Sequence, residues 1–118
     1  MADAALFTGW GPPVRGREAK GLEVFGEAVA FWSQREQAGE IDSYEVVFLA
    51  PHGGDLAGFI LARGSEEQIE ALRDSDELGR LNTRASLIVD HLGVIDAVVG
   101  DAIGEQLGVY QEAIAELT

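Results

Sequence analysis

Each of the two histidines in the chain stands close to an aspartate. His52 lies three residues before Asp55 in a turn-rich stretch, and His91 directly follows Asp90. An imidazole that a carboxylate orients is a standard general base, so these four residues are the candidate catalytic groups. Each histidine also has a purely structural interpretation. His52 can be an ordinary polar loop residue, and His91 can lie in the last turn of a helix, where the helix dipole stabilises it.

Other catalytic patterns are missing. His52-Gly53-Gly54 is similar to the oxyanion loop of esterases, but the sequence contains no G-x-S-x-G nucleophile motif. Rossmann and P-loop fingerprints are absent, and without cysteine there is no thiolate nucleophile or cysteine-bound metal. No histidine pair has metal-site spacing. We expect no metal, no cofactor and no nucleotide chemistry.

A small basic cluster lies just before and inside the first turn of the first predicted helix. Arg15, Arg17 and Lys20 are three of only eight basic residues. Cations at a helix N-terminus oppose the helix dipole, so they cost stability unless an anion or a carboxylate lies among them. Arg15 and Arg17 are therefore candidate ligand-binding residues for a carboxylate or phosphate. The competing interpretation is a salt bridge to the acidic surface of another subunit.

Four aromatic residues can line a cavity between a sheet and its helices: Trp10, Trp32, Phe48 and Phe59. The same spacings are typical of ordinary core packing, and both interpretations stay open. Trp10 and Trp32 complete the set of candidate ligand-binding residues.

A central hairpin is the scaffold for these groups. Two apolar runs, Tyr44 to Ala50 and Leu56 to Ala62, flank Pro-His-Gly-Gly-Asp and predict two antiparallel strands. Alternation puts Phe48 on one face and Val47 on the other, so both faces are apolar. A sheet with one solvated face alternates apolar with polar residues, so each face of this one needs a cover.

The first third of the chain predicts a strand and a helix. Ala4 to Trp10 is a short apolar run that ends at Gly11-Pro12-Pro13, which is typical of a strand. Apolar residues then recur every three or four positions, which predicts a helix from Glu18 to Gln37 that ends at Gly39.

After the hairpin, the spacing predicts a split helix. Ser65 stands three residues before Gln68, the reciprocal capping pattern, and a polar cluster around Ser75 interrupts the helix that follows. Helical spacing then continues to Gly93. The β-prone run Leu87 to Val89 favours a strand instead, and periodicity favours the helix.

The chain closes with a strand and a further helix. Val94 to Val99 lies between two glycines and is strand-like. We expect Asp101 to cap the last helix, to Leu117. One narrow apolar line runs along it: Ile103, Leu107, Tyr110, Ile114 and Leu117. This helix can fold over its own sheet or reach across to a partner.

Composition and charge limit the partners. The chain has 118 residues, 47% of them hydrophobic, which indicates one soluble domain over 1–118 without a membrane span. A net charge of -13 opposes binding to nucleic acid or anionic membranes. No secretion-signal pattern opens the sequence, so we expect a cytoplasmic protein.

The predicted order is strand, helix, strand, strand, helix, strand, with an added C-terminal helix. This is the α+β, ferredoxin-like βαββαβ arrangement, in which both main helices pack on one face of a four-stranded antiparallel sheet. The opposite face is left bare and apolar. A second copy of the sheet is the expected cover, so we expect a homodimer or larger assembly.

Turn and core residues give the chain a resemblance to the dimeric α+β barrel superfamily, and to a group of small uncharacterised bacterial proteins within it. They are Gly39-Glu40-Ile41, Val47-Phe48-Leu49, His52-Gly53-Gly54-Asp55, Gly58-Phe59, Gly64-Ser65, Gly93-Val94 and Gly100. Members of that superfamily include cofactor-independent monooxygenases, isomerases and haem-binding enzymes, so the resemblance implies architecture and leaves the activity open. Asn82 and Trp32 resemble residues that cofactor-free monooxygenases use, but the surrounding motif does not match.

Three hypotheses about function remain. The first is a dimeric barrel that binds a small molecule, anionic or not, or acts through assembly without catalysis. The second is a cofactor-independent isomerase or monooxygenase with His52 or His91 as base and an arginine that stabilises the anion. This second hypothesis requires an imidazole ring that faces into a closed pocket. The third is an interaction module that co-purifies with another protein.

Overall fold

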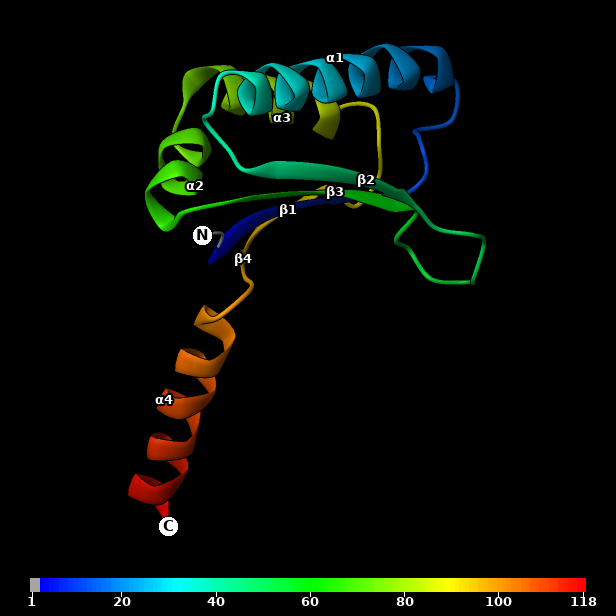
Figure 1. Ribbon diagram of the computed structural model, residues 1–118. Coiled ribbons are helices and arrows are strands. Elements are labelled where there is room, and N and C mark those ends of the chain that lie inside the picture. The colour runs from blue at the N-terminus through cyan, green and yellow to red at the C-terminus, as the bar shows by residue number, and fades with distance from the viewer. Residues whose placement is uncertain (1–2) are drawn as a thin grey trace.

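A four-stranded antiparallel sheet forms the centre of the computed structural model, which describes residues 3–118 (Figure 1). In the order β2-β3-β1-β4, its strands are β1 (Ala4–Trp10), β2 (Ser43–Phe48), β3 (Gly58–Gly64) and β4 (Gly93–Val98). The helices are α1 (Glu18–Gln37), α2 (Glu66–Arg73), α3 (Asp76–Ser86) and α4 (Ala102–Leu117). The predicted ferredoxin-like order, with its split second helix and added C-terminal helix, is confirmed.

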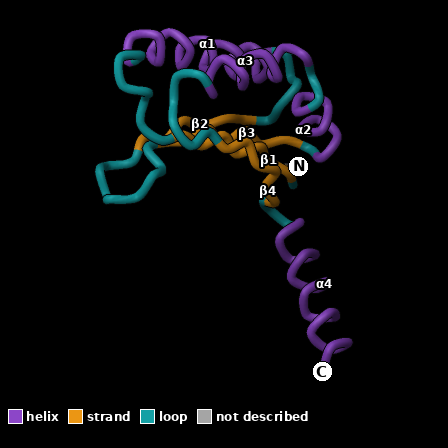
Figure 2. Tube along the Cα trace, turned by 180° about the vertical axis from the view of Figure 1, so that it is seen from behind, coloured by secondary structure: helices purple, strands orange, loops and turns teal. Residues whose placement is uncertain are grey.

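The register of the central strands decides which side chains meet the helices. Leu6 on β1 pairs with Ala62 on β3, and both belong to the buried core. The next pair, Phe7 and Leu61, points to the opposite face because side chains alternate along a strand. Helices α1, α2 and α3 all lie on the Leu6 side of the sheet (Figures 1 and 2).

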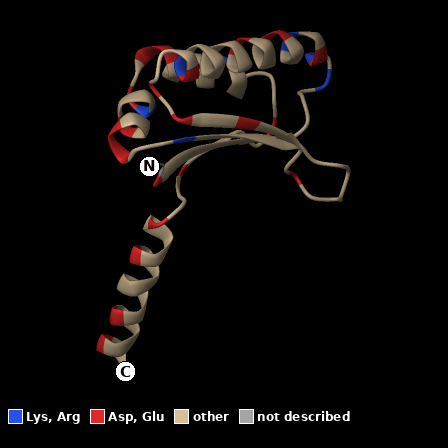
Figure 3. Ribbon diagram, in the orientation of Figure 1, with Lys and Arg blue, Asp and Glu red and all other residues tan. Residues whose placement is uncertain are grey.

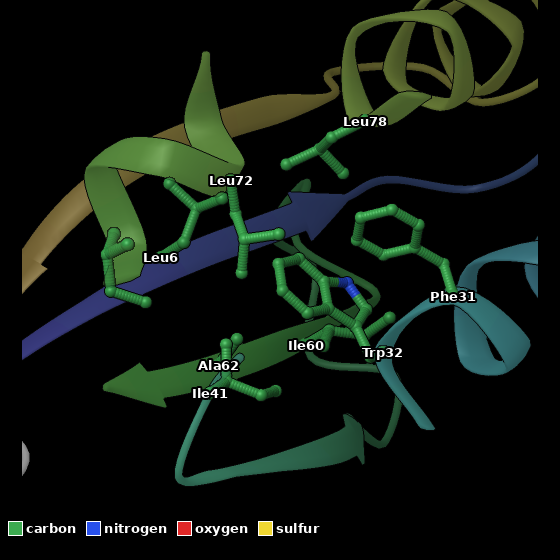
Figure 4. Packing of buried hydrophobic residues seen from close by; sticks show 9 residues of the cluster. Leu6, Phe31, Trp32, Ile41, Ile60, Ala62, Leu72 and Leu78 are labelled. Atoms are coloured by element: carbon green, nitrogen blue, oxygen red, sulfur yellow. The ribbon is translucent and has the colours of Figure 1, made fainter. Parts of the chain in front are cut away.

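The hydrophobic core fills the layer between the sheet and these three helices. Trp32 from α1, Leu78 from α3 and Leu6 from β1 are each at most 2% exposed. Figure 4 shows the cluster, which consists of Leu6, Phe31, Trp32, Ile41, Ile60, Ala62, Ile69, Leu72 and Leu78. It draws on β1, β3, α1, α2 and α3, and Tyr44 and Val46 of β2 pack against it, so the sheet and the helix layer hold each other in place.

Local signals set the helix boundaries as predicted in three places. Helix α1 spans the predicted residues, and Gly39 follows it with a φ of +76°, the left-handed conformation that glycine adopts most readily. The Ser65 hydroxyl accepts from the Gln68 N–H while the Gln68 side chain accepts from the Ser65 N–H, which completes the capping box of α2. Ser75 caps α3 and marks the predicted break.

The end of α3 differs from the prediction. The helix stops at Ser86, and residues 87–92 form neither a continued helix nor a strand beyond one isolated bridge between Pro13 and Val89. The backbone of this segment bonds instead to the loop after β1, with 2.8 Å from the Val14 nitrogen to the Ile88 oxygen and 3.0 Å from the Asp90 nitrogen to the Pro12 oxygen. These distant partners outweigh the helical spacing.

The hairpin strands are shifted from their predicted limits. β2 ends at Phe48 and β3 starts at Gly58, so the connecting loop is longer than the five residues expected. At Gly58 a Cβ atom would lie 2.7 Å from the Val47 carbonyl oxygen and 2.9 Å from the Trp10 ring. Only glycine fits where three strands approach each other so closely.

Helix α4 extends away from the rest of the molecule on the side of the sheet opposite α1–α3 (Figures 1 and 2). None of its residues is buried. It therefore does not fold over its own sheet. The predicted cap is wrong as well, because Asp101 has helical backbone angles and makes no side-chain cap bond. No helix within residues 3–118 has the length and apolar character needed to cross a membrane.

Candidate functional site

A pocket of about 380 Å³ lies between the sheet and the helices α1 and α3. The strands contribute Thr8, Trp10, Phe48 and Ile60 to its lining. Apolar residues of the helices and of the segment after α3 make up most of the rest: Leu22, Val24, Phe25, Ala28, Trp32, Leu78, Leu81, Ala85, Ile88, Val89 and Leu92. Small-molecule sites have volumes of about 300 to 1,000 Å³ and mainly apolar walls, and this pocket fits that description.

Three aromatic rings meet at one part of the lining. Trp10 contacts Phe25 edge to face with ring centroids 6.0 Å apart, and Phe48 lies 5.4 Å from Phe25. Phe48 is 69% exposed and Leu22, also in the lining, is 74% exposed. The pocket therefore opens to solvent here, with aromatic faces and edges available to a flat ligand.

The inner wall of the pocket includes Trp32, which is 2% exposed. Its ring packs perpendicular to Phe31 at 4.9 Å, and it belongs to the core cluster of Figure 4. Trp32 thus both packs the core and lines the pocket, so the two interpretations of its spacing are compatible. Phe59, the fourth aromatic residue of that set, lies on the other face of the sheet and stacks on Phe7 at 5.0 Å; its expected place in the cavity is wrong.

Few polar side chains interrupt the apolar lining. Among its described residues, Asn82 on α3 carries the one amide and Thr8 on β1 the one hydroxyl, and both are half-buried. Glu18, at the start of α1, is exposed. An amide can donate and accept hydrogen bonds at once, so Asn82 is able to orient a polar substituent of a ligand inside the apolar pocket.

Neither histidine lines this pocket. His52 lies in the exposed loop between β2 and β3, where its Nε2 atom is 2.7 Å from the Leu56 carbonyl oxygen and its Nδ1 atom accepts from the Gly54 N–H at 3.2 Å. Both ring nitrogens are thus engaged within the loop. His91 is exposed after α3 with a φ of 57°. The structure gives neither imidazole the pocket position that a general base needs.

The loops that carry the two histidines nevertheless meet at Gly11. A Cβ atom on Gly11 would lie 2.8 Å from the Asp90 carbonyl oxygen and 2.9 Å from that of Asp55. The Gly11 nitrogen also donates to the Asp90 oxygen at 2.7 Å. These contacts use the backbone of the aspartates, and Gly11 itself lines the pocket. In residues 3–118 no three His, Asp or Glu residues gather as a metal site requires.

The basic residues at the start of α1 divide into paired and unpaired groups. Lys20 pairs with Glu23 at 2.9 Å, and this hydrogen bond and charge lower the pKa of the Glu23 carboxyl. Arg15 and Arg17 are exposed and have no ion pair within the described chain. They lie between two residues of the pocket lining, Pro13 and Glu18, but do not line it themselves.

Ion pairs tie the elements around the pocket together. Arg84 on α3 contacts Glu27 on α1 at 2.9 Å, and this contact raises the pKa of Arg84. Arg35, near the end of α1, contacts Glu77 at the start of α3 and stacks over Phe31. The sequence alone did not reveal these pairs, since nothing local matches residues so far apart in the chain.

No known protein-family model matches the chain, and no curated protein matches it. Solved structures do match. A dimeric protein of unknown function and ferredoxin-like fold from Bacteroides fragilis has a TM-score of 0.57 at 9% identity, over 81% of this chain and 96% of its own. A dimeric ferredoxin-like protein of unknown function from Thermobifida fusca has a TM-score of 0.58 at 11% identity, over 84% and 93%.

The fold of this chain is ferredoxin-like. A third similar structure is SnoaB, a cofactor-independent oxygenase from Streptomyces nogalater, with a TM-score of 0.52 and 13% identity over 84% of this chain and 93% of its own. At such identities the likeness shows the ferredoxin-like architecture alone, because one fold supports many unrelated functions.

Sequence reasoning placed Trp10, Trp32 and Phe48 beside a cavity but did not identify most of the other residues that line the pocket. Phe25 was part of the apolar stripe of α1, which indicated that it faces the sheet. Thr8 was assigned to the same face of β1 as Trp10. Ile88 and Leu92 were assigned to a continued helix, and their place in the lining follows from the loop contacts that end α3.

Proposed function

We propose that the protein binds one small, mainly apolar molecule in the pocket between the sheet and α1/α3. The observation that carries this proposal is the pocket itself, about 380 Å³ with an aromatic opening and a single amide among its described lining residues. A flat aromatic molecule with one hydroxyl or carbonyl group matches it, because the rings supply stacking surfaces and Asn82 supplies one polar contact.

Arg15 and Arg17 are the proposed contacts for an acidic group on such a ligand. Both are exposed, lack an ion pair within residues 3–118, and follow Pro13 of the pocket lining. A carboxylate that protrudes from the pocket would relieve the unfavourable position of these cations at the start of α1.

The proposed working form is a homodimer that pairs the helix-free faces of two sheets. This bare face carries Phe7, Val47, Phe59, Leu61 and Ile95. Ile95 is 56% exposed in the single chain. An apolar face of this kind is unusual on a monomer, and two of the similar structures are described as dimeric. Each pocket lies on the outer side of its sheet, so pairing leaves both open.

Thermal-shift measurements with 1-naphthol and 1-naphthoate test the binding proposal. Both probes should raise the melting temperature, because a ligand that binds only the folded state stabilises it. Replacement of Arg15 and Arg17 by glutamine should weaken the response to 1-naphthoate and leave that to 1-naphthol unchanged. An equal loss for both probes would contradict the assignment of the arginines.

A second candidate is cofactor-independent oxygenation of the bound molecule. Asn82 and Trp32 both line the pocket, which supports this candidate over the version that uses a histidine base. SnoaB, a cofactor-independent oxygenase, has a similar fold. Such a reaction requires a ligand that gives up a proton and supplies its own electrons to dioxygen. Oxygen consumption with each binding phenol tests it, and Asn82→Ala should abolish consumption even at a phenol concentration that saturates its weakened binding.

A further inference from the structure

Helix α4 makes up the last part of the chain and buries none of its residues against the rest of residues 3–118. It is 16 residues long with no buried residue, and Figures 1 and 2 show it extending away from the sheet. Leu107 and Tyr110 near its middle are 56% and 65% exposed. Most helical stability in proteins comes from packing of an apolar face, so a helix of this length needs an apolar partner to be stable.

The spacing of the apolar residues indicates what kind of partner. Along α4 they follow steps of four, three, four and three: Ile103, Leu107, Tyr110, Ile114 and Leu117. Such alternate steps average 3.5 residues and form the narrow seam of a two-helix coiled coil, whereas a helix that lies on a sheet has a wider apolar stripe. Helix α4 is therefore built to contact another helix.

The charges of α4 favour an identical helix as that partner. Residues that flank the seam, among them Gln106, Gln111 and Ala113, are uncharged. The acidic residues Glu105 and Glu112 stand opposite the seam in the heptad, and Figure 3 shows the acidic residues of α4 along one side. Two copies of this acidic protein can thus bring their seams together without like charges across the contact.

The direction of α4 makes this contact compatible with the proposed pairing of sheets. At about 1.5 Å per residue α4 is about 24 Å long, and two stacked sheets lie only about 10 Å apart. Helix α4 leaves on the bare-face side (Figure 1), so it extends past the sheet of a facing copy and keeps its seam available. Two heptads are a small seam, and other contacts between the copies would raise its effective concentration.

We propose that α4 pairs with α4 of a second copy through this seam, as an interface separate from the bare sheet face. The contact is isologous, so a residue near its two-fold axis meets its own copy. The proposal concerns assembly alone and does not depend on what the pocket binds.

Disulfide trapping in the full-length protein tests it, because the native sequence has no cysteine. Single cysteines are introduced at the seam positions 103, 107, 110 and 114, with Val109→Cys as the matched control, since Val109 is 66% exposed but lies off the seam. A parallel pair predicts cross-linking at all four seam positions, and an antiparallel pair at the position nearest its axis. Cross-linking no stronger than that of Val109→Cys at every seam position would overturn the proposal.

A second pair of variants measures the contribution of the seam to assembly. Leu107→Glu should reduce the assembled fraction in sedimentation or the helical signal in circular dichroism, and Val109→Glu should change neither. Leu107→Glu should leave the thermal-shift response to 1-naphthol unchanged, which separates this interface from the pocket. Equal effects of Leu107→Glu and Val109→Glu on assembly would contradict pairing through the seam.

Discussion

Trp10 and Phe25 meet edge to face, with ring planes at 65°, at the point where β1 ends beneath α1. This contact joins the last residue of an inner strand to the helix that covers it, and both rings line the pocket. The pocket is therefore formed by the same elements that make the core, which gives it a fixed shape before a ligand arrives.

The backbone at Gly11 should not tolerate a side chain. A Cβ atom there would lie within 3 Å of two carbonyl oxygens, those of Asp90 and Asp55. Both oxygens belong to the backbone, so room for the Cβ atom requires a shift of the loop backbone. Gly11→Ala should lower the free energy of unfolding by about 1 to 3 kcal/mol, as overpacking does. Urea denaturation measures the change.

Gly26→Ala is the matched control for that substitution. Gly26 lies within α1 with nothing inside 4 Å of its would-be Cβ atom, so alanine should stabilise the helix by about 0.5 to 1 kcal/mol. If Gly11→Ala were as stable as Gly26→Ala, the close approach of the two loops at Gly11 would be wrong.

Removal of the Ser65 hydroxyl should destabilise α2. Ser65→Ala loses the bond that the hydroxyl accepts from the Gln68 N–H at 3.1 Å, and we expect a cost of about 1 kcal/mol. Asp101→Ala, at the start of α4, should cost almost nothing because Asp101 makes no side-chain cap bond. Thermal unfolding of the two variants checks the contrast, and a larger loss for Asp101→Ala would contradict the cap assignment.

The cap at Ser65 and the end of α3 illustrate how much of the fold the sequence could predict. The pattern Ser65 to Gln68 is local, and the helix forms where the pattern indicates. The end of α3 was not predictable, because its cause is a set of backbone bonds from residues 87–90 to residues 11–14, far away in the chain. The local spacing of apolar residues in that segment is helical, but its tertiary contacts stabilise a different backbone conformation.

The candidate site shows the same division. Alternation along β1 is enough to put Trp10 on the same face as Leu6, and the apolar stripe of α1 is enough to turn Phe25 and Trp32 toward the sheet. Phe59 was misplaced because both faces of its strand are apolar, so the sequence does not indicate which face the helices cover. The two histidines were candidates on residue type alone, and only the fold reveals that neither lines the pocket.

A charge placed on the bare sheet face should prevent the two sheets from pairing. Leu61→Asp puts a carboxylate beside the stacked rings of Phe7 and Phe59, where burial without a partner is costly. In a Leu107→Glu background, which removes the proposed α4 pairing, light scattering should then report a single chain of 12.6 kDa. Leu87→Asp is the control, since Leu87 is 63% exposed away from the sheet. A mass for Leu61→Asp/Leu107→Glu equal to that of Leu107→Glu alone would refute pairing through this face.

Stability should depend on pH through Glu23. Lys20 lowers the pKa of this carboxyl below its ordinary value of 4.5 by a hydrogen bond and by its charge, with a smaller contribution from Arg84. The lowered pKa means that the ionised form stabilises the fold above pH 4.5 and that this contribution is lost as the pH falls through the folded-state value.

The stability difference between wild type and Glu23→Gln should therefore be present near neutral pH and disappear in acid. Because both partners are exposed, the difference should be small and should shrink in high salt. Urea midpoints of the two proteins across the acidic range measure it. A stability difference that grows as the pH falls would contradict the stabilising pairing of Glu23 with Lys20.

Calorimetric titration of 1-naphthol into wild type, Ala28→Phe and Ala30→Phe tests ligand binding most directly. Ala28 on α1 lines the pocket, whereas Ala30, two residues along the same helix, is exposed. Phenylalanine at position 28 should fill the pocket and abolish binding, while Ala30→Phe should bind as wild type does, with circular dichroism confirming that both variants are folded. Binding by Ala28→Phe with wild-type affinity would contradict the pocket as the ligand site.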